Sequence, residues 1–261
     1  MIQIIRAEIG LLFKKKTTCI VILIFAAFIG FMFFQKAINI KSGFYQKEII
    51  TPFYMIAFSG ALICSTCQIP MSILFGMIGA DCFENNTCAG NILAIGRTRF
   101  VLGKIGCIVI AVIITTCFLF FISMIEGMII NNSWKDFSLW LLIKYYLTTS
   151  FICLAEGFGA FFLAFLFRKS IVGIIGNIAT AYILSFFSGL IPSMSELLSG
   201  SYPFYIMANV FSILSERGDI QLVINASNQQ KALLAVAVII CMLAFESITT
   251  IVISCKREYT A

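Results

Sequence analysis

Six apolar runs, each long enough to cross a lipid bilayer, limit what this chain can fold into. A hydrocarbon core of about 30 Å needs about 20 helical residues, because each residue of an α-helix rises about 1.5 Å. The runs are residues 17–35, 52–80, 105–125, 139–167, 171–191 and 231–254. We therefore predict an all-α membrane protein with six transmembrane helices, forming a single transmembrane domain over residues 1–261. The second run is too long for one upright span, and Pro70 predicts a kink in it.

Composition excludes an ordinary soluble domain. Of 261 residues, 61% are hydrophobic and 11% are charged, whereas charged residues make up about a quarter of a soluble domain. The net charge of +6 comes from cations scattered at loop ends, so we expect no nucleic acid partner. The chain has no histidine and no phosphate-binding loop, and Cys64-x-x-Cys67 lies in an apolar run without a second cysteine pair. We expect no catalytic site, no metal site, no cofactor and no enzyme activity on this chain.

The N-terminal residues 1–16 have the pattern of a helix lying in the membrane interface. Ile2, Ile5 and Ile9 recur at helical spacing, and Lys14 to Lys16 close the segment. Such a helix buries its apolar side in lipid and turns its lysines toward anionic headgroups. A cleavable signal peptide is the alternative, but no small-residue cleavage site follows the apolar run.

Residues 81–104, named here the coupling loop, form the longest polar interruption in the N-terminal half. Acidic residues open it, three candidate helix caps follow, and cations close it. In order, these residues are Asp81, Glu84, Asn85, Asn86, Thr87, Arg97, Arg99 and Lys104. Between caps and cations, the apolar spacing predicts a short amphipathic helix over residues 88–95, which Gly96 ends. The loop is either a charged connector that only fixes topology or a docking surface for a soluble partner.

The coupling loop resembles the first cytoplasmic loop of ABC-2 type transporter permeases. The family pattern is an acidic residue, Gly-Thr, a short helix ending in Leu, a Gly or Pro, an Arg, and Gly-Lys opening the next span. In this sequence those elements read Glu84, Asn86-Thr87, Asn91-Ile92-Leu93, Gly96-Arg97 and Gly103-Lys104. Asn86 stands where Gly is common, and Asn is the next residue able to adopt a left-handed conformation. In that family the loop is a coupling helix that docks on a separate nucleotide-binding subunit.

The resemblance implies an ABC-2 (type V) exporter permease-like fold and a set of partners. Residues 1–16 would be the elbow helix, and residues 192–230 an extracellular or re-entrant segment. The residues implied to couple to the ATPase are Glu84, Asn85, Thr87, Ile92, Leu93, Arg97 and Arg99. The implied partners are an ABC ATPase subunit that binds ATP and Mg, and a second permease copy, identical or related. By similarity to permeases of bacitracin and lantibiotic immunity and of phenol-soluble-modulin-type export, the substrate would be a hydrophobic or amphipathic peptide, a toxin or antimicrobial peptide.

Basic residues predict the orientation of the chain. With both termini in the cytoplasm, the cations of residues 1–16, of the coupling loop, of the Arg168-Lys169 turn and of the C-terminal end share the inner side. This distribution satisfies the positive-inside rule, although the excess is modest. We expect a multi-pass protein of the bacterial cell membrane with the coupling loop in the cytoplasm.

Two carboxyl groups inside the predicted spans allow a second reading. Glu156 and Glu246 lie well within the fourth and sixth runs, where a charged carboxylate costs about 2.5 kcal/mol or more. They either line a translocation pathway, attracting a cation or carrying a proton, or hydrogen-bond to neighbouring helices through residues such as Asn177 or Thr180. A secondary transporter driven by an ion gradient through these glutamates is therefore an alternative function, although no inverted repeat is evident. A non-transporting membrane scaffold is another.

Overall fold

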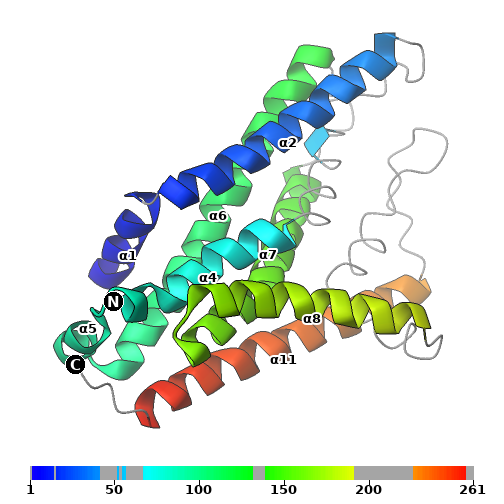
Figure 1. The fold of residues 1–261 in the computed structure, drawn as a ribbon. Helices are drawn as coiled ribbons and strands as arrows, with labels where there is room; N and C mark the ends of the chain where they lie inside the picture. Colours follow the sequence, from blue (N-terminus) through cyan, green and yellow to red (C-terminus); the bar gives the residue numbers. More distant parts are fainter. Residues whose placement is uncertain are drawn as a thin grey trace.

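In the computed structural model of this chain, the residues described are 2–14, 16–41, 52, 55–56, 67–131, 139–190 and 226–256. No strand occurs among them, which confirms the all-α prediction for this part of the chain. The helices are α1 (Ile2–Lys14), α2 (Lys16–Lys41), α4 (Gln68–Glu84), α5 (Cys88–Ile95), α6 (Arg97–Ile130), α7 (Leu139–Phe167), α8 (Ser170–Leu190) and α11 (Ala226–Lys256) (Figure 1).

Among the described residues, three helical segments are long and apolar enough to cross a membrane. They are Arg97–Ile130, Thr149–Phe167 and Ile239–Lys256, and the shorter apolar segments Thr18–Ala27 and Ser170–Ile183 accompany them. These segments support the assignment to a membrane protein. The sequence predicts six spans, and these three segments account for only part of that number.

Helix bounds follow the apolar pattern, with differences at several ends: α2 extends past residue 35 to Lys41, and α6 begins at Arg97, inside the predicted loop 81–104. Helix α7 has the predicted bounds, and α5 covers the predicted residues 88–95. The predicted span 105–125 leads us to expect a loop beginning at Glu126. Instead, Glu126 lies inside α6, because the residues after it are mostly apolar and contain no proline. Pro70 falls in the first turn of α4, where a proline's missing N–H costs nothing, so the helix begins near Pro70 and is not kinked there.

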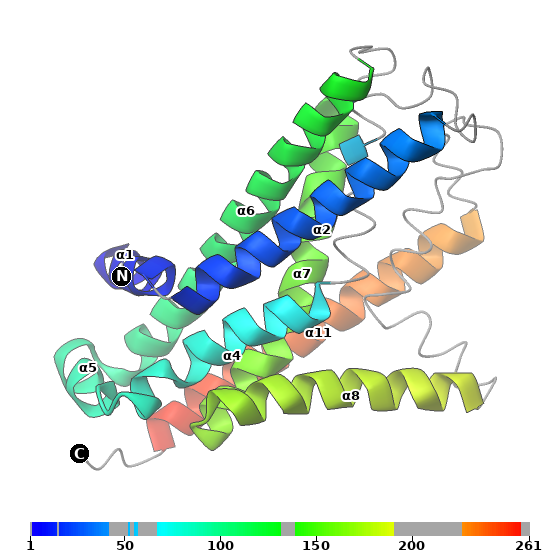
Figure 2. The same cartoon turned by 45° about the horizontal axis from the view of Figure 1, so that its top comes forward.

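Helices α4, α7 and α8 pack against one another as the densest part of the bundle (Figure 2). Glycines allow the close approach: a Cβ at Gly79 would lie 2.8 Å from the carbonyl oxygen of Phe161, and one at Gly157 would lie 2.5 Å from the Phe75 ring. Gly173 likewise faces the backbone of Ala160. Gly157-x-Gly159 and Gly173-x-x-Gly176 are pairs of the kind that the sequence alone predicts to form flat packing surfaces between spans, and the contacts at Gly157 and Gly173 confirm this.

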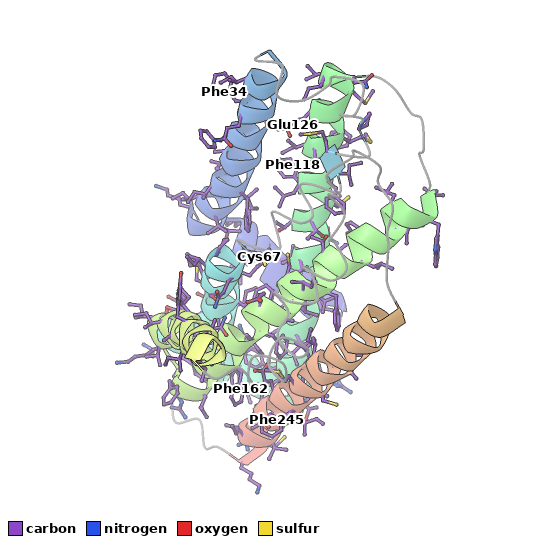
Figure 3. The ribbon with its side chains drawn as sticks, turned by 90° about the vertical axis from the view of Figure 1, so that its right-hand side faces the viewer. Phe34, Cys67, Phe118, Glu126, Phe162 and Phe245 are labelled. Carbon is purple, nitrogen blue, oxygen red and sulfur yellow. The ribbon has the colours of Figure 1, made fainter. Side chains whose placement is uncertain are left out.

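The remaining helices surround this group. Helices α1 and α2 pack against α6, and α11 packs against α6 and α7. Helix α11 is the least covered: 17% of its spanning window is buried, against 50% for that of α7. Phe245, 67% exposed, lies on its outward apolar face (Figure 3). Such a face is suited to contact with lipid chains.

Part of the sequence prediction lies outside the described residues. The proposed extracellular or re-entrant segment 192–230 is described only from residue 226, where α11 begins. Cys64, the first cysteine of the Cys-x-x-Cys pair, also lies outside the described ranges.

Candidate functional site

A tight turn joins α4 to the short helix α5. Asn86 adopts the left-handed conformation, with φ of 55°, which explains why asparagine is acceptable where the family pattern has glycine. The backbone N–H of Thr87 donates to the carbonyl oxygen of Cys82 at 2.9 Å. Thr87 occupies the N-cap position of α5, but its hydroxyl points to the same Cys82 oxygen at 3.5 Å and makes no capping bond. Of the three candidate caps, Thr87 therefore has the predicted N-cap position, but its side chain does not make the predicted capping hydrogen bond.

Helix α5 turns one side to the protein and the other to solvent. Cys88 and Ile92 are buried in the core, whereas Gly90 and Ala94 are exposed. Leu93 lies in the same helix. Gly96, with φ of 88°, ends α5 and begins α6; its N–H donates to Ile92 O at 2.8 Å. A residue with a side chain would be strained at this φ, so glycine sets the angle between the two helices.

Glu84, the last residue of α4, binds the start of α8. Its Oε1 accepts hydrogen bonds from the backbone N–H and the hydroxyl of Ser170, each at 2.7 Å. Ser170 is the first residue of α8, whose early N–H groups have no partner within the helix. A carboxylate there satisfies one of them and interacts favourably with the helix dipole. Nearby, the Arg168 guanidinium lies 5.7 Å from the centroid of the Phe83 ring.

Arg97, the first residue of α6, binds the end of α11. Its Nη1 donates to the carbonyl oxygen of Cys255 at 2.5 Å, and the Thr98 hydroxyl lies 3.7 Å from the Cys255 sulfur. The last carbonyl groups of a helix lack intrahelical donors, and a cation suits the negative end of the dipole. Arg99, two residues further on, is exposed. The two ends of the coupling loop are thus attached to α8 and to α11.

Lys104 is fully buried, which the sequence did not indicate. Its Nζ donates to Ile78 O of α4 at 2.7 Å and lies 3.4 Å from Oε1 of Glu8 on α1. It also lies 5.3 Å from the centroid of the Phe100 ring. Placed by sequence among the cations that flank a span, Lys104 instead joins three helices beneath α5. Glu8 and Lys104 are 96 residues apart in the sequence. They meet because α1 packs against α6.

Two cysteines meet where α4 and α5 adjoin. A hydrogen bond to Cys88 and then burial raise the pKa of the Cys82 thiol above its ordinary value. The same hydrogen bond lowers the pKa of the Cys88 thiol, helped by the positive charges of Lys104 and Arg168 and opposed by burial. Cys88 is therefore the thiol of this pair that ionises first.

A polar chain of contacts crosses the packed group of α4, α7 and α8. The side-chain amide Nδ2 of Asn177 donates to Ser72 Oγ at 2.8 Å and to the backbone oxygen of Glu156 at 2.7 Å. The Ser72 hydroxyl donates to Gln68 O at 2.6 Å. The sequence allowed a structural role in which Glu156 hydrogen-bonds to Asn177. The two residues are in contact, but the bond is accepted by the backbone oxygen of Glu156 and not by its carboxyl group. Thr180 instead donates to Gly176 O of its own helix.

The two glutamates that sequence placed inside spans both lie close to Asn177. Glu156 is 8% exposed. Oε1 of Glu246 and Oδ1 of Asn177 both lie within 4 Å of the point that a Cβ at Gly159 would occupy. Glu126, which sequence reasoning placed in a loop, is 7% exposed near the other end of α6 (Figure 3). Its Oε2 has no hydrogen-bond partner among the described residues.

Comparison with known proteins adds no assignment: no protein-family model matches the chain, and no curated protein does.

Proposed function

We propose that this chain is the permease subunit of an ATP-driven ABC exporter with six spans, which moves hydrophobic or amphipathic peptides out of a bacterial cell. ATP would be hydrolysed on a separate ATPase subunit, and two permease subunits would form the pathway. The proposal rests on the motif resemblance of the coupling loop, and the arrangement around α5 supports it.

The observation that carries the proposal is the attachment of the coupling loop to several helices. Glu84 binds the start of α8, Arg97 binds the end of α11, and Lys104 joins α1, α4 and α6. A partner that displaced α5 would therefore move helices that are distant in sequence. Rigid-body rotation of helices by a docked subunit needs such direct ties. A connector that only fixed topology would not need them.

Burial and hydrogen bonding together divide the implied coupling residues into three groups. Asn85, Thr87 and Arg99 are exposed and available to a partner, as is Ala94. Ile92 is 7% exposed and faces the protein's own core, so its role would be to hold α5 in place. Glu84 and Arg97 are exposed but engaged in the ties. We therefore assign partner docking to the first group and transmission to Glu84 and Arg97.

Co-purification of the full chain with candidate ATPase subunits tests this proposal, with ATP hydrolysis measured in the presence and absence of an amphipathic helical peptide. The wild type should form a stable complex whose turnover the peptide raises. Arg99→Glu should weaken the complex, because it reverses the charge of the docking surface. Arg6→Glu is the matched control, since Arg6 is an equally exposed arginine on α1.

The transmission role is tested separately with Glu84→Gln combined with Arg97→Gln. This variant should still bind the ATPase but lose stimulation by the peptide. Full stimulation in this variant would show that motion is transmitted by another route. Failure of every candidate ATPase to bind overturns the permease proposal. Transport that is abolished by collapsing the proton gradient would favour the secondary transporter.

A further inference from the structure

The orientation of the Asn177 side chain is fixed by its neighbours. The atom facing the backbone oxygen of Glu156 must be the amide nitrogen, because a carbonyl oxygen only accepts hydrogen bonds. The Ser72 hydroxyl proton is already donated to Gln68 O, so Ser72 accepts the second proton of the Asn177 amide. Both amide protons of Asn177 are thereby used. Its Oδ1 must point the other way, toward Gly159 and α11.

On that side, a carboxyl group shares the space beside Gly159 with Oδ1 of Asn177. Oε1 of Glu246 and Oδ1 of Asn177 lie around the same Gly159, where the missing Cβ leaves room for both. Thr250, one turn along α11, donates its hydroxyl to the backbone oxygen of Glu246 and not to the carboxyl. Two side-chain oxygen atoms gathered at one glycine between apolar helices repel unless one of them carries a proton.

No ion pair joins Glu246 to a cation whose side chain the structure describes. The charged residues of α6 and α7, the helices that pack against α11, are Arg97, Arg99, Lys104, Glu126, Lys144 and Glu156. Arg97 is engaged with Cys255, and Lys104 with Glu8 and Ile78. Glu156, on the facing side of α7, is itself acidic. An ionised carboxyl at this depth would therefore be both desolvated and unpaired.

We infer that the Glu246 carboxyl is protonated and donates a hydrogen bond to Oδ1 of Asn177. One bound proton then completes a directed chain, from Glu246 of α11 through Asn177 of α8 and Ser72 of α4 to Gln68 O. Glu246 is a positioning residue in this arrangement: its proton attaches α11, the least covered span, to the densest part of the bundle. This inference rests on contacts within the chain and does not depend on the transport proposal.

Infrared spectroscopy of the full chain in lipid nanodiscs at neutral pH tests the inference. The C=O stretch of a protonated carboxyl is separate from the bands of a carboxylate. The wild type should show this band, to which the buried Glu126 and Glu156 can add components of their own. Glu246→Gln should remove one component of the band, and Glu156→Gln, the matched control, should leave that component in place. Asn177→Leu should shift the band to higher frequency, because the acceptor of its hydrogen bond is gone. A spectrum of Glu246→Gln identical to that of the wild type overturns the inference.

Thermal unfolding of the same samples provides a second test. A glutamine at position 246 can donate to Asn177 as the protonated acid does, so Glu246→Gln should unfold at the wild-type temperature. Glu246→Leu, of similar size but without a donor, should unfold at a lower temperature. Should Glu246→Leu not fold, loss of the infrared band from the wild type on titration to alkaline pH is the remaining test. Equal unfolding temperatures for the Gln and Leu variants would show that Glu246 donates no hydrogen bond.

Discussion

Gly159 has no room for a side chain, because the space of its missing Cβ is taken by Oδ1 of Asn177. Gly159→Ala should therefore displace Asn177 from Ser72 and destabilise the protein by about 1–3 kcal/mol, as overpacking does. Thermal unfolding in detergent measures the effect. Gly90→Ala is the control, since a Cβ at Gly90 meets nothing within 4 Å and alanine favours a helix by about 1 kcal/mol over glycine. Equal destabilisation by both substitutions would contradict the packing of Asn177 against Gly159.

The thiol of Cys88 offers a second residue-scale prediction, on pH dependence. The hydrogen bond from Cys82 lowers the pKa of Cys88, and the thiolate is the form that reacts with alkylating reagents. In Cys82→Ala this pKa should rise, so the pH midpoint of Cys88 alkylation, followed by mass spectrometry, should move to higher pH. Cys153→Ala, which removes a buried thiol elsewhere, should leave the midpoint unchanged. An unchanged midpoint in Cys82→Ala would show that the two thiols do not interact.

At the scale of elements, Lys104 of α6 connects α1 to the bundle through its ion pair with Glu8. Lys104→Met leaves Glu8 of α1 partly buried without a cation and removes the side-chain hydrogen bond to Ile78 O. Breaking a buried ion pair from one side costs about 3–5 kcal/mol, so hydrogen exchange over residues 2–14 should become faster. Adding Glu8→Gln removes the unpaired charge and should recover part of the loss. Unchanged exchange in Lys104→Met would mean that apolar contacts alone hold α1.

The periodicity of apolar residues predicts where the helices lie in the sequence. It does not predict which helices contact one another. The bounds of α5 and α7 follow from apolar spacing, a terminating glycine and a charged turn, which are all local signals. Glu84 and Arg97 were predicted as coupling residues from a motif, yet no local signal points to Ser170 or Cys255 as their partners. Lys104 was placed among solvated cations for the same reason. Which cation is buried depends on how helices distant in sequence pack together.

At the scale of the whole molecule, one end of the bundle gathers the cations. The ties of Glu84 to Ser170 and of Arg97 to Cys255 bring the coupling loop, the Arg168-Lys169 turn and the end of α11 together. The contact of Glu8 with Lys104 adds α1 to the same end (Figure 1). The opposite end includes Leu139, because the 29 residues of α7 rise about 43 Å from it to the turn. The positive-inside rule then predicts that the end with the coupling loop faces the cytoplasm.

Labelling of intact cells with a membrane-impermeant maleimide tests this orientation. Cys255 is exposed at the coupling-loop end and should react only after the membrane is permeabilised. Leu139→Cys, at a position 63% exposed, should react in intact cells, and the unsubstituted chain shows the background from the native cysteines. The reverse pattern would place α5 outside, away from ATP. No cytoplasmic ATPase could then dock on it, and the exporter proposal would fall together with the orientation.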